Sequence, residues 1–369
     1  AAVAAFVRSN AVDLVFVGPE APLASGVSDA ARAAGALVFG PSRSASRLET
    51  TKAFAKDFMN RHAVPTARSR ACASAAEAKA AAREFGGACA VKADGPAAGK
   101  GVVVCGSLAE ADSAVDALAA TDAGRTLVVE ERLEGPELTV LLLVDGRGWA
   151  SLALSQDHKR LRDGDAGPNT GGMGALAPAP LEPAAWRAIE KTVIEPTLSG
   201  LQKEGLDYRG ALYVGVMLAP DGPKVLEYNA RFGDPETQAV LPLLDADLLM
   251  LAADCAAGTL TPGKLPSRPG ACVGITLASP GYPEAPRTGA ELDLSAVSGS
   301  EDVLIFHAGT KKTQAGWTAT GGRVLTVVGR GADLAAARAR AYDAVARLKI
   351  PGLHYRRDIG AKALGRAVA

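Results

Sequence analysis

Short apolar runs, each ending at a Gly-Pro pair, open the chain. Asp13–Val17 and Ala36–Phe39 are such runs, and a helical stretch near Ala24–Ala34 lies between them. An apolar run of this length predicts a buried strand. A strand, a helix and a strand joined by short loops predict parallel pairing. We therefore expect an incomplete parallel sheet, preceded by the end of a helix at Ala1–Ser9.

The next segment alternates helices and strands and predicts a small α+β unit. Phe54 and Phe58 have helical spacing within Thr51–His62. Ser74 and Glu77 form a capping box, which predicts that a helix begins there and runs to Phe85. The other predicted elements are strands Cys89–Ala93, Val102–Cys105, Thr126–Glu131 and Leu138–Asp145 and helix Leu108–Ala120.

A polar segment separates this unit from the rest of the chain. Asp163–Gly174 is dense in Gly, Asp, Asn and Pro, which predicts a loop. Loops of this length in a compact domain are usually functional or disordered. Pro262–Pro269 is similar in composition and indicates a domain boundary. The other predicted elements are helices Pro183–Gly205 and Asp333–Leu348, a hairpin of Gly210–Leu218 and Pro223–Tyr228 turning at Asp221-Gly222, and strands Ala271–Ala278, Val303–His307 and Gly322–Val328.

Composition narrows the class of protein. The chain has 369 residues, of which 48% are hydrophobic, enough for a sizeable core. Its formal net charge is zero, which argues against a nucleic-acid partner. No apolar run approaches the ~18 residues of a membrane span, and no secretory signal is visible. The cysteines are odd in number and lack a CxxC pair, so we expect buried thiols in a reducing compartment.

The strongest chemical signal lies at the end of the predicted hairpin. Glu227 and Asn229 are two residues apart, so on a strand they point to the same face. A carboxylate and a carboxamide oxygen suit a hard divalent cation. The alternative is a pair of solvated residues at a strand end. The run Arg231–Glu236 adds a guanidinium, two carboxylates and a tight turn, which favours the metal site.

The segment Lys92–Gly101 is rich in glycine but is not a P-loop. That motif needs Gly where Asp94 stands and Ser or Thr where Gly101 stands, and it leads into a helix rather than a second strand. A glycine-rich hairpin can still fold its backbone N–H groups over phosphates, and Lys92 is placed to pair with one. The alternative is an ordinary glycine turn. Lys52, taken alone, indicates a surface lysine.

Three further segments carry weaker signals. The strand end Val129–Leu133, with Glu137 after it, can offer backbone groups to an adenine edge and a carboxylate to ribose hydroxyls. His158 is either a base or a structural histidine, and the neighbouring Lys159 and Arg160 can bind phosphate. Pro168–Gly174 combines glycines with small polar side chains, which suits close approach to a phosphate or polar substrate; a plain flexible loop is the alternative.

Taken together, these segments resemble the ATP-grasp ligases, and most closely the glycinamide ribonucleotide synthetase family (phosphoribosylamine–glycine ligases). The resemblance runs in order over almost the whole chain. Its most specific parts are the runs Arg231–Gln238 and Gly167–Gly174. It also includes Gly18–Leu23, Lys52-Ala-Phe54, Lys92–Gly95, Ala97–Val102, Ser155–Arg160, Phe306–Thr310 and Arg357–Gly360.

The resemblance implies a reaction and a role for each segment. Glycine would be joined to 5-phosphoribosylamine through a glycyl phosphate, giving glycinamide ribonucleotide, ADP and phosphate. The implied ATP-binding residues are Lys52, Lys92, Gly99, Lys100, Gly101, Glu130, Glu131, Leu133 and Glu137. The implied metal ligands, for Mg²⁺ or Mn²⁺, are Glu227 and Asn229. Asp157, Lys159 and Arg231 would be catalytic, and Asn169, Thr170, Gly171, Gly172, Arg231 and Asp234 would hold substrate.

The same resemblance implies a multidomain α/β and α+β fold. Residues 1–48 would form a partial Rossmann-like N-terminal domain, 49–66 with 134–262 the ATP-grasp core, 67–133 a lid, and 263–369 a C-terminal α+β domain. This sequence departs from the family's pattern in two places. Pro96 replaces the family's usual Leu in the glycine loop. The family's opening strand and Gly-rich turn, which help to bind the phosphoribosyl substrate, have no counterpart before Ala1, so we expect a fragment.

Two other functions fit the same sequence. One is an ATP-grasp ligase for a different carboxylate and amine. The other is a non-catalytic nucleotide-binding remnant that has lost substrate binding with the missing N-terminal segment. For the glycine ligase as for these alternatives, we expect small-molecule ligands, no nucleic-acid or membrane partner, and a monomer or weak dimer. We expect a cytoplasmic location, or a plastid if a transit segment is missing upstream.

Overall fold

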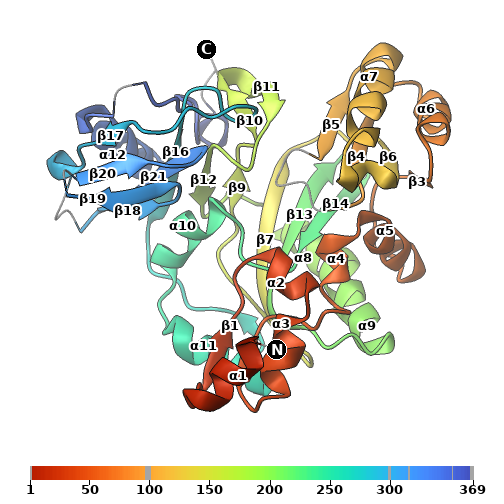
Figure 1. The fold of residues 1–369 in the computed structure, drawn as a ribbon, viewed down its shortest axis with the longest axis horizontal. Coiled ribbons are helices and arrows are strands. Elements are labelled where there is room, and N and C mark those ends of the chain that lie inside the picture. The colour runs from red at the N-terminus through yellow and green to blue at the C-terminus, as the bar shows by residue number, and fades with distance from the viewer. Residues whose placement is uncertain (1, 96–100, 298–300, 315, 351, 366–369) are drawn as a thin grey trace. The chain divides into compact units, whose positions relative to one another are not determined.

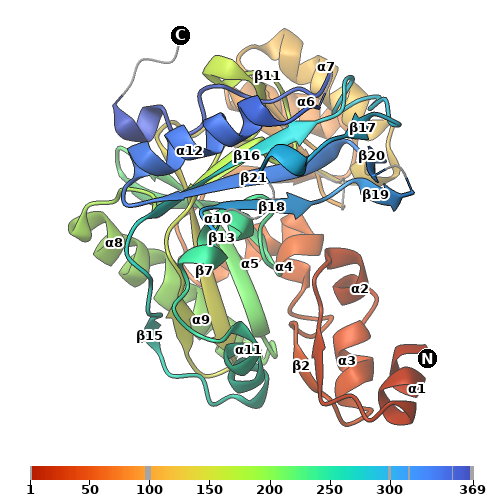
Figure 2. The same ribbon diagram turned by 90° about the vertical axis from the view of Figure 1, so that its left-hand side faces the viewer.

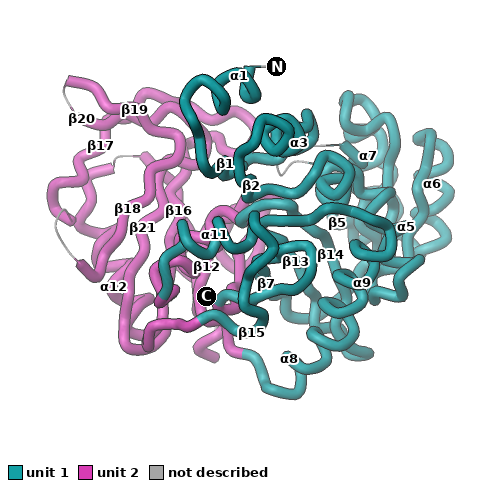
Figure 3. Tube along the Cα trace, turned by 90° about the horizontal axis from the view of Figure 1, so that it is seen from below, with its two compact units in different colours: residues 1–152, 181–232, 246–265 teal, residues 153–180, 233–245, 266–369 magenta. Residues whose placement is uncertain are grey.

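The computed structural model describes residues 2–95, 101–297, 301–314, 316–350 and 352–365. These residues form two compact units, shown in Figure 3. Unit 1 comprises residues 1–152, 181–232 and 246–265, and unit 2 comprises residues 153–180, 233–245 and 266–369. Each unit is built from several separate stretches of chain, so contacts distant in sequence hold it together.

The N-terminal part of unit 1 is a two-stranded parallel sheet. Strands β1 (Leu14–Phe16) and β2 (Leu37–Phe39) pair in the register Leu14↔Leu37, as the sequence predicts. Parallel strands need a crossover, which here contains two helices instead of the single one predicted. The helices of this part are α1 (Ala2–Ser9), α2 (Glu20–Ala24) and α3 (Val27–Arg32). Gly26 separates α2 from α3 because it adopts a left-handed φ of 79°.

A second part of unit 1 is a four-stranded antiparallel sheet with the strand order β3-β6-β4-β5. Its strands are β3 (Ser69–Cys72), β4 (Cys89–Ala93), β5 (Val102–Cys105) and β6 (Leu127–Glu131). Helices α6 (Ala75–Glu84) and α7 (Leu108–Ala119) lie side by side and pack on it (Figure 1). The predicted cap is confirmed, since Ser74 Oγ accepts a hydrogen bond from Glu77 N (3.2 Å). Ser107 and Glu110 begin α7 in the same way.

The largest sheet of unit 1 has the order β14-β13-β7-β8-β15. Its strands are β7 (Glu137–Asp145), β8 (Trp149–Ser151), β13 (Arg209–Ala219), β14 (Gly222–Asn229) and β15 (Gly263–Lys264). The predicted hairpin of β13 and β14 is confirmed, with Ala219 opposite Gly222. Around it lie α4 (Arg47–Thr50), α5 (Lys52–Arg61), α8 (Pro183–Ile189), α9 (Glu195–Lys203) and α11 (Leu248–Ala257). A π-helical turn, Glu190–Ile194, interrupts the helix predicted over 183–205.

Unit 2 contains a five-stranded sheet of order β18-β21-β16-β12-β9. Its strands are β9 (Gln156–Asp157), β12 (Gly174–Ala177), β16 (Ala271–Ala278), β18 (Val303–His307) and β21 (Arg323–Gly331). Helix α12 (Leu334–Arg347) runs along β16 and β21 (Figure 2), and α10 (Glu236–Val240) packs on β12. A smaller sheet contains β17 (Glu291–Leu292), β19 (Thr310–Thr313) and β20 (Gly316–Ala319).

The prediction of a plain loop over residues 163–174 is only partly right. Ala166–Asn169 forms strand β11, which pairs with β10 (Arg160–Arg162) in a short irregular hairpin. Strand β11 has no local sequence signal, because it consists of Ala, Gly, Pro and Asn, which are poor strand formers. The division of the chain into an N-terminal domain, an ATP-grasp core, a lid and a C-terminal domain, with the bounds given above, stays a prediction.

Candidate functional site

Two lysines of unit 1 share one buried carboxylate. On β4, Lys92 lies opposite Val128 of β6, so Glu130, two residues further along, is on the same face. Lys92 Nζ lies 2.9 Å from Glu130 Oε1 as an ion pair without hydrogen-bond geometry, and it donates to Leu226 O at 3.1 Å. Both side chains are less than a tenth exposed. The structure thus brings together two of the predicted ATP-binding residues.

Lys56 is the other lysine, and the sequence analysis missed it. Its Nζ lies 3.0 Å from Glu130 Oε2 and donates to Thr66 Oγ1 at 2.7 Å. Burial lowers the pKa of Lys56 to about 8 and Lys92 adds to the effect, whereas Glu130 opposes it. One signal was available, because Lys52 and Lys56 are four residues apart on α5 and therefore share a face.

Lys52 lies at the first turn of α5, close to the same charges. Burial is the main cause that lowers its pKa, and Lys92 adds to it, while Glu227 is the largest opposing influence. Asp94, which follows β4, accepts a hydrogen bond from Ala53 N at 2.7 Å. A carboxylate at a helix N-terminus is stabilised by the helix dipole, so Asp94 anchors the start of α5 beside the predicted glycine loop.

The remaining predicted ATP-binding residues are less closely grouped. Glu131 is held by Arg68, whose Nε lies 2.6 Å from Glu131 Oε2. Its carboxylate is therefore already engaged. Leu133 and Glu137 are half-buried at the two ends of the connection to β7. Gly101 is buried and its carbonyl accepts a hydrogen bond from Ala93 N at 2.8 Å. Gly99, Lys100 and the unusual Pro96 lie outside the described residues.

The two predicted metal ligands, Glu227 and Asn229, end strand β14. Both are half-buried, and Tyr228 between them is only 2% exposed, which is the alternation expected if they share the opposite face. Their oxygens are hard donors of the kind that Mg²⁺ and Ca²⁺ prefer. Among the described residues, no group of three or more His, Cys, Asp or Glu side chains is arranged to hold a metal ion.

A cluster of charges surrounds the start of the run after β14. Arg231 Nε lies 3.1 Å from Glu49 Oε1 and 3.2 Å from Glu20 Oε2. Glu49 Oε2 also accepts a hydrogen bond from Ala230 N at 2.7 Å. The pKa of Glu49 is raised to about 7, chiefly by burial, while Arg231 opposes and the carboxylates of Glu20 and Glu227 add to the effect. A cation near Glu227 would relieve this crowding of carboxylates, so the donor set fits a metal.

Glu20 and Glu49 are residues that the sequence analysis missed. The resemblance implies a catalytic and a substrate-binding role for Arg231, and in this structure its guanidinium is paired with Glu20 and Glu49 and donates to Phe232 O at 3.0 Å. Glu20 stands inside the family-like run Gly18–Leu23, which was the available signal. Glu49 lies in none of the motifs that the sequence offers.

The other predicted residues lie in unit 2, around a turn. Thr170 is buried, its N–H donates to Lys159 O at 2.8 Å, and its Oγ1 accepts from Gly172 N at 3.0 Å. Gly172 has a φ of +112°, and a Cβ there would lie 2.3 Å from Pro235 Cδ, so only glycine fits. Asp157 Oδ1 accepts a hydrogen bond from His158 N at 2.6 Å. These contacts and the steric limit at Gly172 constrain the backbone of the turn.

Two residues that the sequence did not single out hold this turn. Arg323 Nη1 donates to Gly171 O and to Asp234 O, both at 2.7 Å, and Arg323 Nη2 lies 3.3 Å from Asp234 Oδ2. The Tyr282 hydroxyl accepts a hydrogen bond from Gly171 N at 3.0 Å. The predicted site residues thus form two groups, one within each compact unit.

His158 is a structural histidine. Its Nε2 accepts a hydrogen bond from Gly360 N (3.3 Å), so the ring proton is on Nδ1, which donates to Gly174 O (3.2 Å). Burial and then Arg356 are the main causes that lower its pKa to about 4. The imidazole is therefore neutral near pH 7, and both of its nitrogens are engaged. Of the two predicted roles, the structure favours the structural one.

All five cysteines are free and buried, as expected. Among the described residues, none of the helices has the length and apolar character needed to cross a membrane.

The chain matches three sequence models of one family, in order. They are described as the N domain (residues 1–49), the ATP-grasp (A) domain (residues 50–237) and the C domain (residues 272–362) of phosphoribosylglycinamide synthetase. The chain is 44% identical to a phosphoribosylamine–glycine ligase of Ralstonia nicotianae, over 98% of this chain and 87% of that protein. It is 46% identical to one of Leifsonia xyli, over 98% and 88%.

Solved structures agree with the sequence matches. A phosphoribosylamine–glycine ligase from Thermotoga maritima superposes with a TM-score of 0.79 at 37% identity, covering 87% of this chain and 81% of that one. The biotin carboxylase domain of 2-oxoglutarate carboxylase from Hydrogenobacter thermophilus superposes with a TM-score of 0.73 at 18% identity, over 96% and 78%. At that identity the second likeness concerns the fold alone, whereas the family model over residues 50–237 confirms the expected ATP-grasp domain.

The shared carboxylate leads to a stability prediction. Glu130→Gln leaves the buried ammonium groups of Lys56 and Lys92 without a carboxylate, and an uncompensated buried charge is strongly destabilising, so we expect a loss of about 3 kcal/mol in the free energy of unfolding. Adding Lys56→Met to that variant removes one of the two unpaired charges and should recover part of the loss, with a coupling of at least ~1 kcal/mol in a double-mutant cycle followed by urea unfolding. Strictly additive losses would contradict the pairing.

The control for this cycle is the exposed ion pair of Arg70 and Glu84, whose side chains are 62% and 53% exposed. Arg70→Met should change the free energy of unfolding by less than about 1 kcal/mol, because exposed pairs contribute little.

Proposed function

Because this chain belongs to the phosphoribosylglycinamide synthetase family, we infer that it joins glycine to 5-phosphoribosylamine in an ATP-dependent step of purine biosynthesis. The products are glycinamide ribonucleotide, ADP and phosphate. The observation that carries this conclusion is the ordered match of three domains of one family along the chain. The relatives share more than 40% of their residues with it over most of their length.

The chemistry requires activation of a carboxylate. An amine cannot displace oxide from a carboxylate, so the carboxylate must first acquire a better leaving group. A glycine oxygen attacks the γ-phosphorus of ATP, the bond to ADP breaks, and glycyl phosphate forms. The amine of phosphoribosylamine then attacks the acyl carbon, loses a proton, and expels phosphate. The first step needs positioning and charge neutralisation more than covalent help from the protein.

The nucleotide-side residues of unit 1 suit that need. Lys52 and Lys92 are assigned to the phosphates of ATP. Lys92 can turn from Glu130 toward a phosphate because Lys56 remains to neutralise that carboxylate, 3.0 Å away. Glu130, Glu131 and Leu133 are assigned to the adenine side and Glu137 to the ribose. Gly99, Lys100 and Gly101 are assigned to a loop over the phosphates.

The family uses ATP with a divalent metal, and we propose that this metal is Mg²⁺ or Mn²⁺. Glu227 and Asn229 would hold it, since hard oxygen donors with few protein ligands are typical of Mg²⁺ bound to a nucleotide. When bound, the ion neutralises negative charge on the transferring phosphate. Arg231, held between Glu20 and Glu49, presents a fixed positive charge two residues beyond Asn229.

The unit 2 residues are assigned to glycine and phosphoribosylamine. Lys159 supplies a cation, and the turn Asn169–Gly172 supplies polar groups and close backbone approach. Asp157 and Asp234 supply carboxylates that suit an amine. The ordered contacts within this turn support the assignment, since a substrate site has to be rigid to hold its ligand in one orientation.

Several expectations remain predictions. Neither a different carboxylate and amine nor a non-catalytic remnant is favoured by the relatives. A monomer or weak dimer, with no nucleic-acid or membrane partner, is still expected. We place the enzyme in the cytoplasm, a reducing compartment that suits its free cysteines; the plastid alternative has no support.

The direct test of the function is a substrate-omission experiment. Purified protein with ATP and Mg²⁺ should release phosphate in step with glycinamide ribonucleotide only when glycine and phosphoribosylamine are both supplied. Equal turnover with alanine or another carboxylate in place of glycine would contradict the proposed specificity. Nucleotide binding with no product from any amine would support the non-catalytic alternative.

The metal assignment has its own prediction. Glu227→Gln keeps the shape of the side chain and removes its charge, so the Mg²⁺ concentration for half-maximal turnover should rise by about tenfold or more. Asp221→Asn, at the exposed turn of the same hairpin, is the matched control and should leave the Mg²⁺ dependence unchanged. A Glu227→Gln enzyme with the wild-type Mg²⁺ dependence would rule out this ligand.

A further inference from the structure

The C-terminal segment His354–Lys362 has no role in the assignments above, although it includes the family-like run Arg357–Gly360. At its centre is Arg356, whose side chain is fully buried. A buried guanidinium is tolerated only when carboxylates or carbonyls surround it. The partners of Arg356 therefore show what this segment does.

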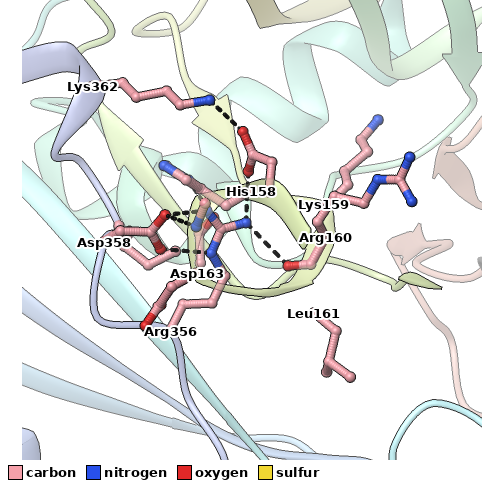
Figure 4. Close-up of polar contacts among 12 residues, drawn as sticks. His158, Lys159, Arg160, Leu161, Asp163, Arg356, Asp358 and Lys362 are labelled. Atoms are coloured by element: carbon pink, nitrogen blue, oxygen red, sulfur yellow. Dashed lines mark hydrogen bonds and ion pairs between the residues drawn. The ribbon is translucent and has the colours of Figure 1, made fainter. Parts of the chain in front are cut away.

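Every nitrogen of the Arg356 guanidinium is engaged. Nε donates to Asp358 Oδ1 at 2.7 Å and Nη2 donates to Asp358 Oδ2 at 2.6 Å, a bidentate pair. Nη1 lies 2.8 Å from Asp165 Oδ1 and donates to Arg160 O at 3.1 Å. Figure 4 shows the guanidinium beside Asp358, with its bond to the Arg160 carbonyl. Arg356 thus connects the C-terminal segment to residues almost 200 positions earlier.

Other contacts also join the C-terminal segment to residues 158–165. Arg357 N donates to Asp163 Oδ1 at 2.7 Å, and Gly164 N donates to Asp358 Oδ2 at 2.9 Å. His354 Nε2 donates to Leu161 O at 2.8 Å. Lys362 pairs with Asp165, and Gly360 N donates to His158 Nε2. Together these contacts hold the stretch 158–165 along most of its length.

This stretch has little support of its own. The β10–β11 ladder contains only the pairs Arg160↔Asn169 and Arg162↔Ala166, with an irregularity between them. Apart from the buried His158, its side chains are half-buried or exposed, so no hydrophobic core fixes it. Burial alone would raise the pKa of Asp358, but hydrogen bonds from Arg356 and from Gly164 N outweigh it and lower it to about 2. The ionic contacts are therefore formed throughout the neutral range.

The stretch leads directly to the predicted substrate residues. Lys159 O accepts the hydrogen bonds of Thr170 N and Thr170 Oγ1, at 2.8 and 2.9 Å. In Figure 4 the side chains of Lys159 and Arg160 extend away from the Arg356–Asp358 pair. The contacts of the C-terminal segment thus fix the backbone of this stretch, while the side chain of Lys159 points away from the Arg356–Asp358 pair.

We propose that Arg356, with Asp358 and Asp165, is a positioning element that holds residues 158–165 so that Lys159 and the turn Asn169–Gly172 can bind glycine or phosphoribosylamine. The proposal rests on the proposed function for the identity of these ligands. Arg356 does not itself bind them, because its side chain is 0% exposed and each of its nitrogens already has a partner. Ligand binding at the turn Asn169–Gly172 therefore depends on a segment far away in the sequence.

The test compares Arg356→Lys with the wild-type enzyme. Lysine keeps the charge but loses the planar fork that reaches two carboxylates and a carbonyl at once. Amide hydrogen exchange should become faster in peptides covering residues 158–172 and stay unchanged in peptides covering β7. The KM for glycine or phosphoribosylamine should rise by about tenfold or more, because misplaced binding groups are costly. The affinity for an ATP analogue with Mg²⁺, measured by calorimetry, should stay within about twofold of wild type.

A milder variant keeps the test decisive if Arg356→Lys folds poorly. Asp165→Asn removes one charge from a side chain that is 40% exposed, and asparagine tolerates the left-handed φ of 53° found there. We expect faster amide exchange over residues 158–172 and a higher KM, both smaller in size than for Arg356→Lys. Arg347→Lys is the matched control, since Arg347 is exposed in the same unit, and it should behave as wild type.

Two results would overturn the proposal. One is unchanged exchange and unchanged KM values in a folded Arg356→Lys enzyme. The other is an equal loss of affinity for the ATP analogue, which would indicate a general structural role. If the wild-type protein released no phosphate in response to glycine, the proposed function would be contradicted instead. The hydrogen-exchange comparison would still decide whether Arg356, Asp358 and Asp165 hold residues 158–165.

Discussion

The pairing of buried charges is the constraint on which both units depend. A charge removed from water is tolerated only with a partner close by. In unit 1, Glu130 is buried between Lys56 and Lys92. In unit 2, Arg356 is buried among Asp358, Asp165 and the Arg160 carbonyl. Each cluster joins distant parts of the chain directly beside residues assigned to a ligand, so the contacts that stabilise the fold also shape the candidate site.

Most of the fold could be predicted from the sequence because local signals agreed with each other. Strands Cys89–Ala93, Val102–Cys105, Ala271–Ala278 and Val303–His307 lie within the bounds expected from their apolar runs. Strand β11 escaped prediction because only its pairing with β10 makes it a strand. The π-helical turn at Glu190–Ile194 also has no local signature, since its residues suit an ordinary α-helix.

The candidate site was predictable only where its residues form dense local motifs. Glu227 and Asn229 could be found because they share a strand face, and the glycine turn because of its composition. Glu49 and Arg356 could not, because their importance comes from partners far away: Glu49 bonds to Ala230, 181 residues later, and Arg356 to Arg160, 196 residues earlier. Such contacts exist only in the folded chain.

We propose that this chain activates glycine by phosphorylating its carboxylate, and that reaction determines where the two carboxylate oxygens go. Glycine labelled with ¹⁸O in both carboxylate oxygens would be supplied with ATP and phosphoribosylamine, and the released phosphate analysed by mass spectrometry. A glycyl phosphate keeps one labelled oxygen in the new amide and transfers the other to phosphorus. Phosphate carrying one ¹⁸O atom for each glycinamide ribonucleotide formed is the expected result, and unlabelled phosphate would contradict it.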